Sequence, residues 1–169
     1  MYARFQSLWR DHEGSALLEG VIVMPFLCAI FFGVYEYSWF FYKQHLVSTG
    51  VRDAARYLAR TLDPVNPTTP TTSLTPSFAT ATPFAKNLAT RGTIDTSGTL
   101  RVSGWAAADV TPTLTAIANP PGTYLAPNPL YIVTVTTSFT PSTLGFLGYF
   151  GLPAPTISVT HQERLIGPS

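Results

Sequence analysis

The chain has 169 residues, of which 46% are hydrophobic and only 11% are charged, and its formal net charge is +1. Ordinary soluble domains carry about 25% charged residues, so the composition is skewed toward apolar side chains. A net charge this close to zero gives no basis for a nucleic-acid footprint. The single cysteine, Cys28, excludes a disulfide within the chain and says nothing about redox compartment.

The apolar residues are densest from Ala16 to Tyr42, where only Glu19 and Glu36 carry charge. As a helix this stretch would be about 40 Å long. A membrane-spanning helix needs about 20 largely apolar residues, so the stretch is sufficient. A cleaved secretory signal would end at a small-residue site, and none follows the run. The pattern favours a retained membrane anchor, and a buried core helix of a soluble protein remains the main alternative.

An aromatic and basic edge closes the apolar segment. Trp39, Tyr42 and Lys43 have the chemistry that is found where a helix leaves the bilayer, and we predict that they lie at the membrane interface. Lysines and arginines flank the segment on both sides. The positive-inside count alone therefore leaves the orientation ambiguous.

The helical pattern continues beyond the apolar segment, and we predict one helix over residues 15–62 that spans the membrane in its first half. Pro25 removes a backbone hydrogen bond and predicts a kink. Asp63-Pro64 ends the pattern, because the residue before proline avoids the helical region. Asp53 is in reach of Arg56 on the same helix. Small and branched apolar residues recur on one face of the second half, at Val47, Val51, Ala54, Ala55, Leu58 and Leu62.

Residues 63–98 read as a Thr/Pro-rich loop followed by a short helix from Phe84 to Gly92. Residues 99–169 read as a small antiparallel β domain. Its expected strands are 99–103, 110–117 (interrupted by Pro112), 131–139 and 156–161, the last running on toward Leu165. The aromatic loop 141–155 reads equally well as a contact surface or as a flap over the sheet. The expected fold is α+β, with the long helix packed on the sheet.

No residue pattern indicates catalysis. Nucleotide-binding and nucleophile motifs are missing from the sequence, and His12, His45 and His161 lie too far apart to suggest a metal site. We therefore expect a non-enzymatic chain without metal or cofactor. Glu19 is the exception that needs an explanation, because a carboxylate at the centre of a membrane helix costs roughly 2.5–3.5 kcal/mol and less near the ends. It could reach the headgroups, complement the helix dipole, or pair with an amine of another chain.

The run from Asp11 to Leu27 resembles the N-terminus of TadE-like pseudopilins, minor subunits of the tight-adherence (Flp, type IVc) pilus. The shared features are a short polar leader, Gly14, a glutamate five residues on at Glu19, and a Met-Pro step at Pro25. A Phe-Gly-x-x-Glu block ending at Glu36 and an alanine- and arginine-rich helix end at residues 51–59 extend the likeness. One departure is Gly20, where the pilins of this system carry an aromatic residue.

The resemblance implies a pilin-like fold and a prepilin-type leader, residues 1–14, which a prepilin peptidase removes between Gly14 and Ser15. Glu19 would then pair with the Ser15 amine of a neighbour and set the register of assembly. Implied partners are the peptidase, other pilins and pseudopilins, the inner-membrane assembly platform and the lipid bilayer. The N-terminus would be cytoplasmic and the C-terminal domain extracytoplasmic or in the pilus, with roles in adhesion and biofilm formation. The alternative is an uncleaved single-pass envelope protein whose small domain binds a partner.

Overall fold

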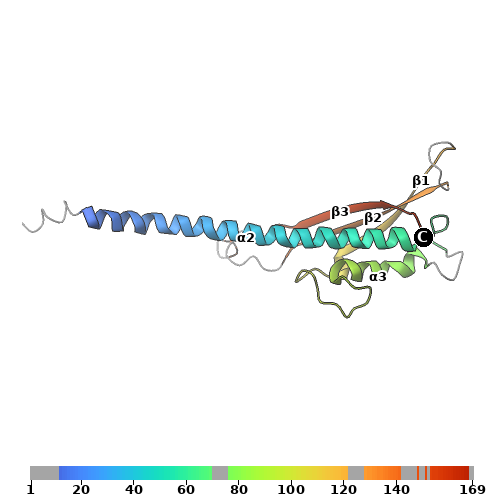
Figure 1. The fold of residues 1–169 in the computed structure, drawn as a ribbon, viewed down its shortest axis with the longest axis horizontal. Coiled ribbons are helices and arrows are strands. Elements are labelled where there is room, and N and C mark those ends of the chain that lie inside the picture. The colour runs from blue at the N-terminus through green and yellow to red at the C-terminus, as the bar shows by residue number, and fades with distance from the viewer. Residues whose placement is uncertain are drawn as a thin grey trace, which may run out of the picture.

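The computed structural model describes residues 12–69, 76–121, 128–141, 148, 151 and 153–167, with side chains from Leu17 onward. Its elements are α2 (His12–Thr61), α3 (Phe78–Arg91), the 3-10 turn η1 (Ala107–Asp109), β1 (Val110–Ile117), β2 (Leu130–Phe139) and β3 (Ile157–Arg164). Figure 1 shows α2 as a long rod, with the other elements gathered around its second half as a compact head. The fold is α+β, as predicted.

Helix α2 runs without a break for 50 residues and contains Pro25. At 1.5 Å per residue it is about 75 Å long. The predicted helix 15–62 is therefore confirmed as one continuous element. All six residues predicted for its apolar face, from Val47 to Leu62, are fully buried in the head. The 3.6-residue periodicity of the apolar residues in this half therefore predicted correctly which face of the helix is buried.

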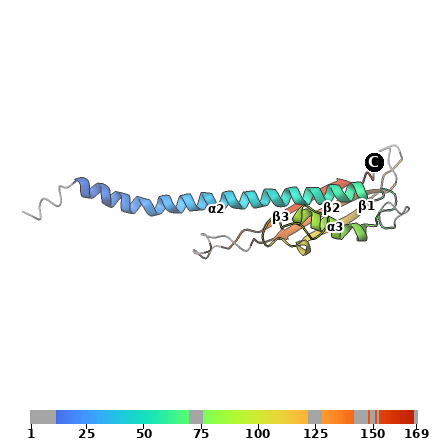
Figure 2. The same ribbon diagram turned by 60° about the horizontal axis from the view of Figure 1, so that its bottom comes forward.

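The sheet is antiparallel with strand order β1-β2-β3. The inward side chains of the central strand, Val133 and Val135, pair with Leu114 and Pro112 on one side. Helices α2 and α3 lie side by side against the sheet (Figures 1 and 2). Proline cannot donate to a strand ladder, and Pro112 is tolerated because β1 is an edge strand. The strand predicted at 110–117 is thus confirmed despite this proline.

Helix α3 begins earlier than predicted. It starts at Phe78 rather than Phe84, because Ser77 caps its first turn by accepting a hydrogen bond from the Thr80 backbone N–H at 3.3 Å. Pro83 lies inside the helix, in its second turn, where it removes one backbone hydrogen bond. The helix ends at Gly92, which adopts a left-handed φ of 77° and donates its N–H to the Leu88 carbonyl at 3.0 Å.

The strand predicted at 99–103 is wrong. This segment is an irregular loop whose Arg101 N–H donates to the Thr90 carbonyl at the end of α3 (2.8 Å). The alternation came from Leu100 and Val102, but only Val102 is buried, whereas Leu100 is 40% exposed. The predicted aromatic loop 141–155 falls mostly outside the described residues.

Trp105 is the centre of the head. Its ring is fully buried, stacks on Phe139 at a centroid distance of 5.9 Å, and donates its indole N–H to the Thr137 hydroxyl at 2.9 Å. The same hydroxyl donates to the Asp109 carbonyl at 2.9 Å. This chain of two bonds satisfies every polar atom that the indole brings into the core, as a buried tryptophan requires.

The closest approach of α2 to α3 is at Gly50. A methyl group there would collide with the Ala89 carbonyl oxygen and lie 2.9 Å from a ring atom of Trp105. We expect Gly50→Ala to destabilise the head by about 1–3 kcal/mol, since a helix backbone cannot yield as a side chain can. Urea unfolding followed by circular dichroism in detergent micelles measures this.

Gly33→Ala is the matched control, because nothing lies within 4 Å of the added methyl. It should leave stability unchanged or raise it by up to about 1 kcal/mol through helix propensity. If Gly50→Ala and Gly33→Ala had the same free energy of unfolding, the close packing of α3 and Trp105 against Gly50 would be contradicted.

The Trp105–Thr137 hydrogen bond gives a second prediction. Thr137→Val keeps the shape but leaves the indole N–H and the Asp109 carbonyl without this partner. The expected loss is about 2 kcal/mol in the same unfolding assay. Thr115→Val, on the exposed face of β1, should stay within about 0.5 kcal/mol of the parent protein. A neutral Thr137→Val would show that the buried bond contributes nothing net.

Candidate membrane anchor and assembly surface

Residues 17–32 of α2 project from the head and are exposed at every position. Large apolar side chains cover the whole circumference; for example, Phe26 and Phe31 are each 67% exposed. The helix is long and apolar enough to cross a membrane, and the apolar stretch of it is not buried inside the protein. The alternative of a buried core helix does not fit. A helix that is hydrophobic all round needs lipid or other helices around it.

The residues predicted for processing and register lie at the start of this anchor. The backbone of Gly14 and Ser15 is helical, and Glu19 is exposed within the apolar surface. Positions 15 and 19 are four residues apart and thus share one face of the helix. At Gly20 a side chain would meet nothing within 4 Å. The structure leaves the roles of these residues, and of Pro25 as a kink, as predictions.

The predicted interface residues lie together on α2 but differ in burial. Trp39 and Tyr42 are about half exposed and stack at a centroid distance of 5.4 Å. Lys43 is only 8% exposed, and its Nζ lies 5.9 Å from the centroid of the Trp39 ring. The lysine is therefore buried beside an aromatic pair that is exposed. Their placement at a membrane surface remains a prediction.

The covered face extends closer to the anchor than the sequence indicated. Glu36 is 5% exposed and sits two turns before Lys43, so two ionisable side chains occupy the same buried stripe. Sequence reasoning treated Glu36 as an interruption of the membrane segment and Lys43 as its edge. The seven-residue steps from Glu36 to Lys43 and on to Gly50 are the signal that could have revealed the stripe.

Two ion pairs tie α2 to the head. Asp53 pairs with Arg101 at 2.8 Å and fastens the helix to the loop after α3. Arg56 approaches Glu163 of β3 at 3.8 Å, and Glu163 is also 3.0 Å from the His161 ring. The predicted Asp53–Arg56 pair is therefore wrong. Both side chains found partners on other elements, which local spacing cannot anticipate.

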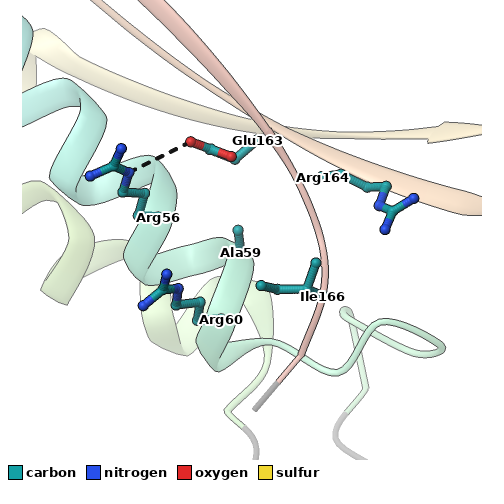
Figure 3. A pocket seen from close by; sticks show the side chains of 6 residues that line it. All are labelled: Arg56, Ala59, Arg60, Glu163, Arg164 and Ile166. Atoms are coloured by element: carbon teal, nitrogen blue, oxygen red, sulfur yellow. Dashed lines mark ion pairs between the residues drawn. The ribbon is translucent and has the colours of Figure 1, made fainter. Parts of the chain in front are cut away.

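The exposed side of α2 has a hollow on each flank. One, of about 450 Å³, lies between α2 and the end of β3 and is lined by Arg56, Ala59, Arg60, Glu163, Arg164 and Ile166 (Figure 3). The other, of about 390 Å³, is lined by Asp53, Arg56, Tyr57, Arg60, Thr61 and Leu88. Within the described residues no group of three metal-ligating side chains occurs. Neither hollow holds a catalytic constellation.

The protruding apolar helix and the compact head indicate a single-pass, membrane-anchored protein with a small α+β domain. A family model described as TadE-like protein matches residues 14–56. The match confirms the resemblance over the first and middle parts of α2 and associates the chain with Tad pilus systems, a structural, non-enzymatic setting. No curated protein and no solved structure is significantly similar to the chain.

Proposed function

We propose that this protein is a minor pseudopilin of the tight-adherence (Flp, type IVc) pilus. In this role it takes part in pilus assembly, and through the pilus in adhesion and biofilm formation. The observation that carries the proposal is the family match, which begins at Gly14 and covers Glu19 on a fully exposed apolar helix. A protein that only needed a tether would gain nothing from a carboxylate in that surface.

The proposed maturation begins at the leader, residues 1–14. A prepilin peptidase cuts after Gly14, which frees the Ser15 amine at the cytoplasmic surface of the inner membrane. The head then lies on the extracytoplasmic side, and the anchor waits in the bilayer. Other pilins and the assembly platform are the partners that would draw it out.

Glu19 has a specific role in this scheme. The Ser15 ammonium of one subunit and the Glu19 carboxylate of its neighbour can pair only when the two helices are staggered along their axes. A buried ion pair contributes little net stability, because desolvation offsets much of the attraction. Removing one partner is nevertheless costly, so the pair selects one stagger among many. The carboxylate thus acts on register rather than on strength.

The first test of this proposal is intact-mass analysis of protein extracted from membranes that contain the cognate peptidase. We expect a chain that begins at Ser15. The lost segment carries Arg4, Arg10, Asp11 and Glu13, so two positive and two negative charges leave together and the net charge stays +1. Replacing Gly14 by valine should block the cut, so that this variant is recovered with the mass of its full-length chain. A parent protein that still begins at Met1 would refute processing.

The second test replaces Glu19. Glu19→Gln keeps the size and removes the charge, so the protein should still insert and be cut, while its incorporation into pili is lost. Breaking a buried pair costs about 3–5 kcal/mol, enough to abolish assembly at ordinary subunit levels. Glu19→Asp, which keeps the charge, should retain part of the activity. Immunoblots of sheared pili measure the outcome, and normal incorporation of the glutamine variant would favour the uncleaved envelope protein.

A further inference from the structure

Helix α2 carries a basic ridge, formed by Arg52, Arg56 and Arg60, on the side of the head that is open to solvent. The three arginines are spaced by four residues and therefore follow one line on the helix surface. We infer that this ridge is a docking surface for an acidic, amphipathic helix of a partner protein. This inference concerns the head and does not depend on leader processing or on Glu19.

Within the described residues the three arginines of the ridge contact one carboxylate, that of Glu163. Asp53 is paired with Arg101 at 2.8 Å, and Glu163 is shared between His161 at 3.0 Å and Arg56 at 3.8 Å. Arg56 touches Glu163 only at 3.8 Å, and its side chain is 57% exposed. Arg52 and Arg60 form no ion pair with the described part of the chain. Arg60 complements the end of the helix dipole, but Arg52 and Arg56 lie too far upstream to do so.

Figure 3 shows Arg56 and Arg60 projecting from the same side of α2, whereas Arg164 extends away from them. The side chains therefore form a row along the helix rather than a closed ring around the hollow. A row suits several carboxylates in sequence better than one small anion. Arginines four residues apart rise by about 6 Å, which is also the rise between acidic residues at positions i and i+4 of a facing helix.

The flanks of the ridge indicate a protein partner. On one side the hollow of about 450 Å³ presents Ala59 and the 57% exposed Ile166. On the other side the hollow of about 390 Å³ presents Leu88 and Tyr57. Burial raises the pKa of the Tyr57 phenol above its usual value, so this side chain stays neutral beside the arginines. Leu88 and Tyr57 on one flank and Ile166 on the other place apolar contacts beside the charged row. Such a surface fits apolar side chains beside acidic ones, which a polysaccharide or polyphosphate lacks.

Two other occupants are disfavoured by position and charge. With the predicted membrane boundary at Tyr42, the ridge begins about 15 Å along α2 at Arg52 and ends about 27 Å along it at Arg60. These are roughly two to three Debye lengths at physiological salt, so attraction to headgroups around the anchor is largely screened. A second copy of the head offers no row of acidic side chains that could face the three arginines of the ridge. Helix α3 has no acidic residue, and no two carboxylates of the described head lie four residues apart on a helix.

The experiment uses full-length protein in nanodiscs of neutral lipid and two synthetic helical peptides. One peptide carries Glu at positions i, i+4 and i+8 with flanking leucines, and the other carries Lys at the same positions. Fluorescence anisotropy gives the affinities. We expect the Glu peptide to bind and to weaken steeply as NaCl rises from about 25 mM to about 500 mM. The double variant R56E/R60E should lose at least about tenfold in affinity for it and gain affinity for the Lys peptide.

Lys86→Glu is the control for a charge reversal elsewhere on the head. It reverses one positive charge on α3 away from Leu88, against two in R56E/R60E, and should leave binding unaltered. R56Q/R60Q removes the charges without reversing them, and unchanged thermal unfolding of this variant separates docking from misfolding. Equal binding by the parent protein and both double variants would overturn the inference. Ridge-dependent binding of heparin or of anionic vesicles, without binding of the Glu peptide, would overturn it as well.

Discussion

The rest of the structure depends on the division of one helix between two environments. From Leu17 to Phe32 every side chain of α2 faces outward, and from Val47 to Leu62 one face of the same helix forms the core of the head. Apolar surface buried in the head contributes roughly 25 cal/mol per Å², and this term holds α3 and the sheet to the helix. Because α2 is unbroken, any force on the anchor is transmitted directly to the head.

The head is fitted to α2 by close contact as well as by apolar area. The absence of a side chain at Gly50 lets the α3 backbone and the Trp105 ring approach the helix directly. The indole then brings one polar atom into the core, and Thr137 with Asp109 satisfies it. Asp53 and Arg101 fasten the adjoining loop from outside. These contacts specify one arrangement of the helix pair, whereas area alone would permit sliding.

Features that arise from local spacing were predictable from the sequence. The long helix, its buried face and the strands near 131–139 and 157–164 follow from periodicity over a few turns or a few residues. The failures involve partners that are distant in the chain. Asp53 pairs with a residue 48 positions away, and no local rule distinguishes it from the nearer Arg56. In the same way, Leu100 and Val102 alternate as strand residues do, but the burial of Val102 in the head comes from an irregular loop.

In the candidate site, too, features set by local spacing were predictable and features set by distant contacts were not. Glu19, the glycine before the anchor and the apolar run were identified from spacing and agree with the family match over residues 14–56. The burial of Glu36 and Lys43 was missed, because it depends on segments that return to α2 from elsewhere in the chain. The basic ridge was visible in the sequence as three arginines four apart. Its two hollows were not, because they form only where α2 meets α3 and β3.

The covered stripe at Glu36 and Lys43 has a consequence for packing between molecules. Glu36 and Lys43 are buried, whereas Tyr37, Phe41 and Tyr42 are exposed, so a neighbouring helix can contact this part of α2 only outside the buried stripe. Axial stagger and azimuth are separate degrees of freedom in a helical array. A carboxylate near the tip of the anchor can restrict the stagger, but the one-sided shielding of the helix farther along restricts the rotation of each subunit about its own axis.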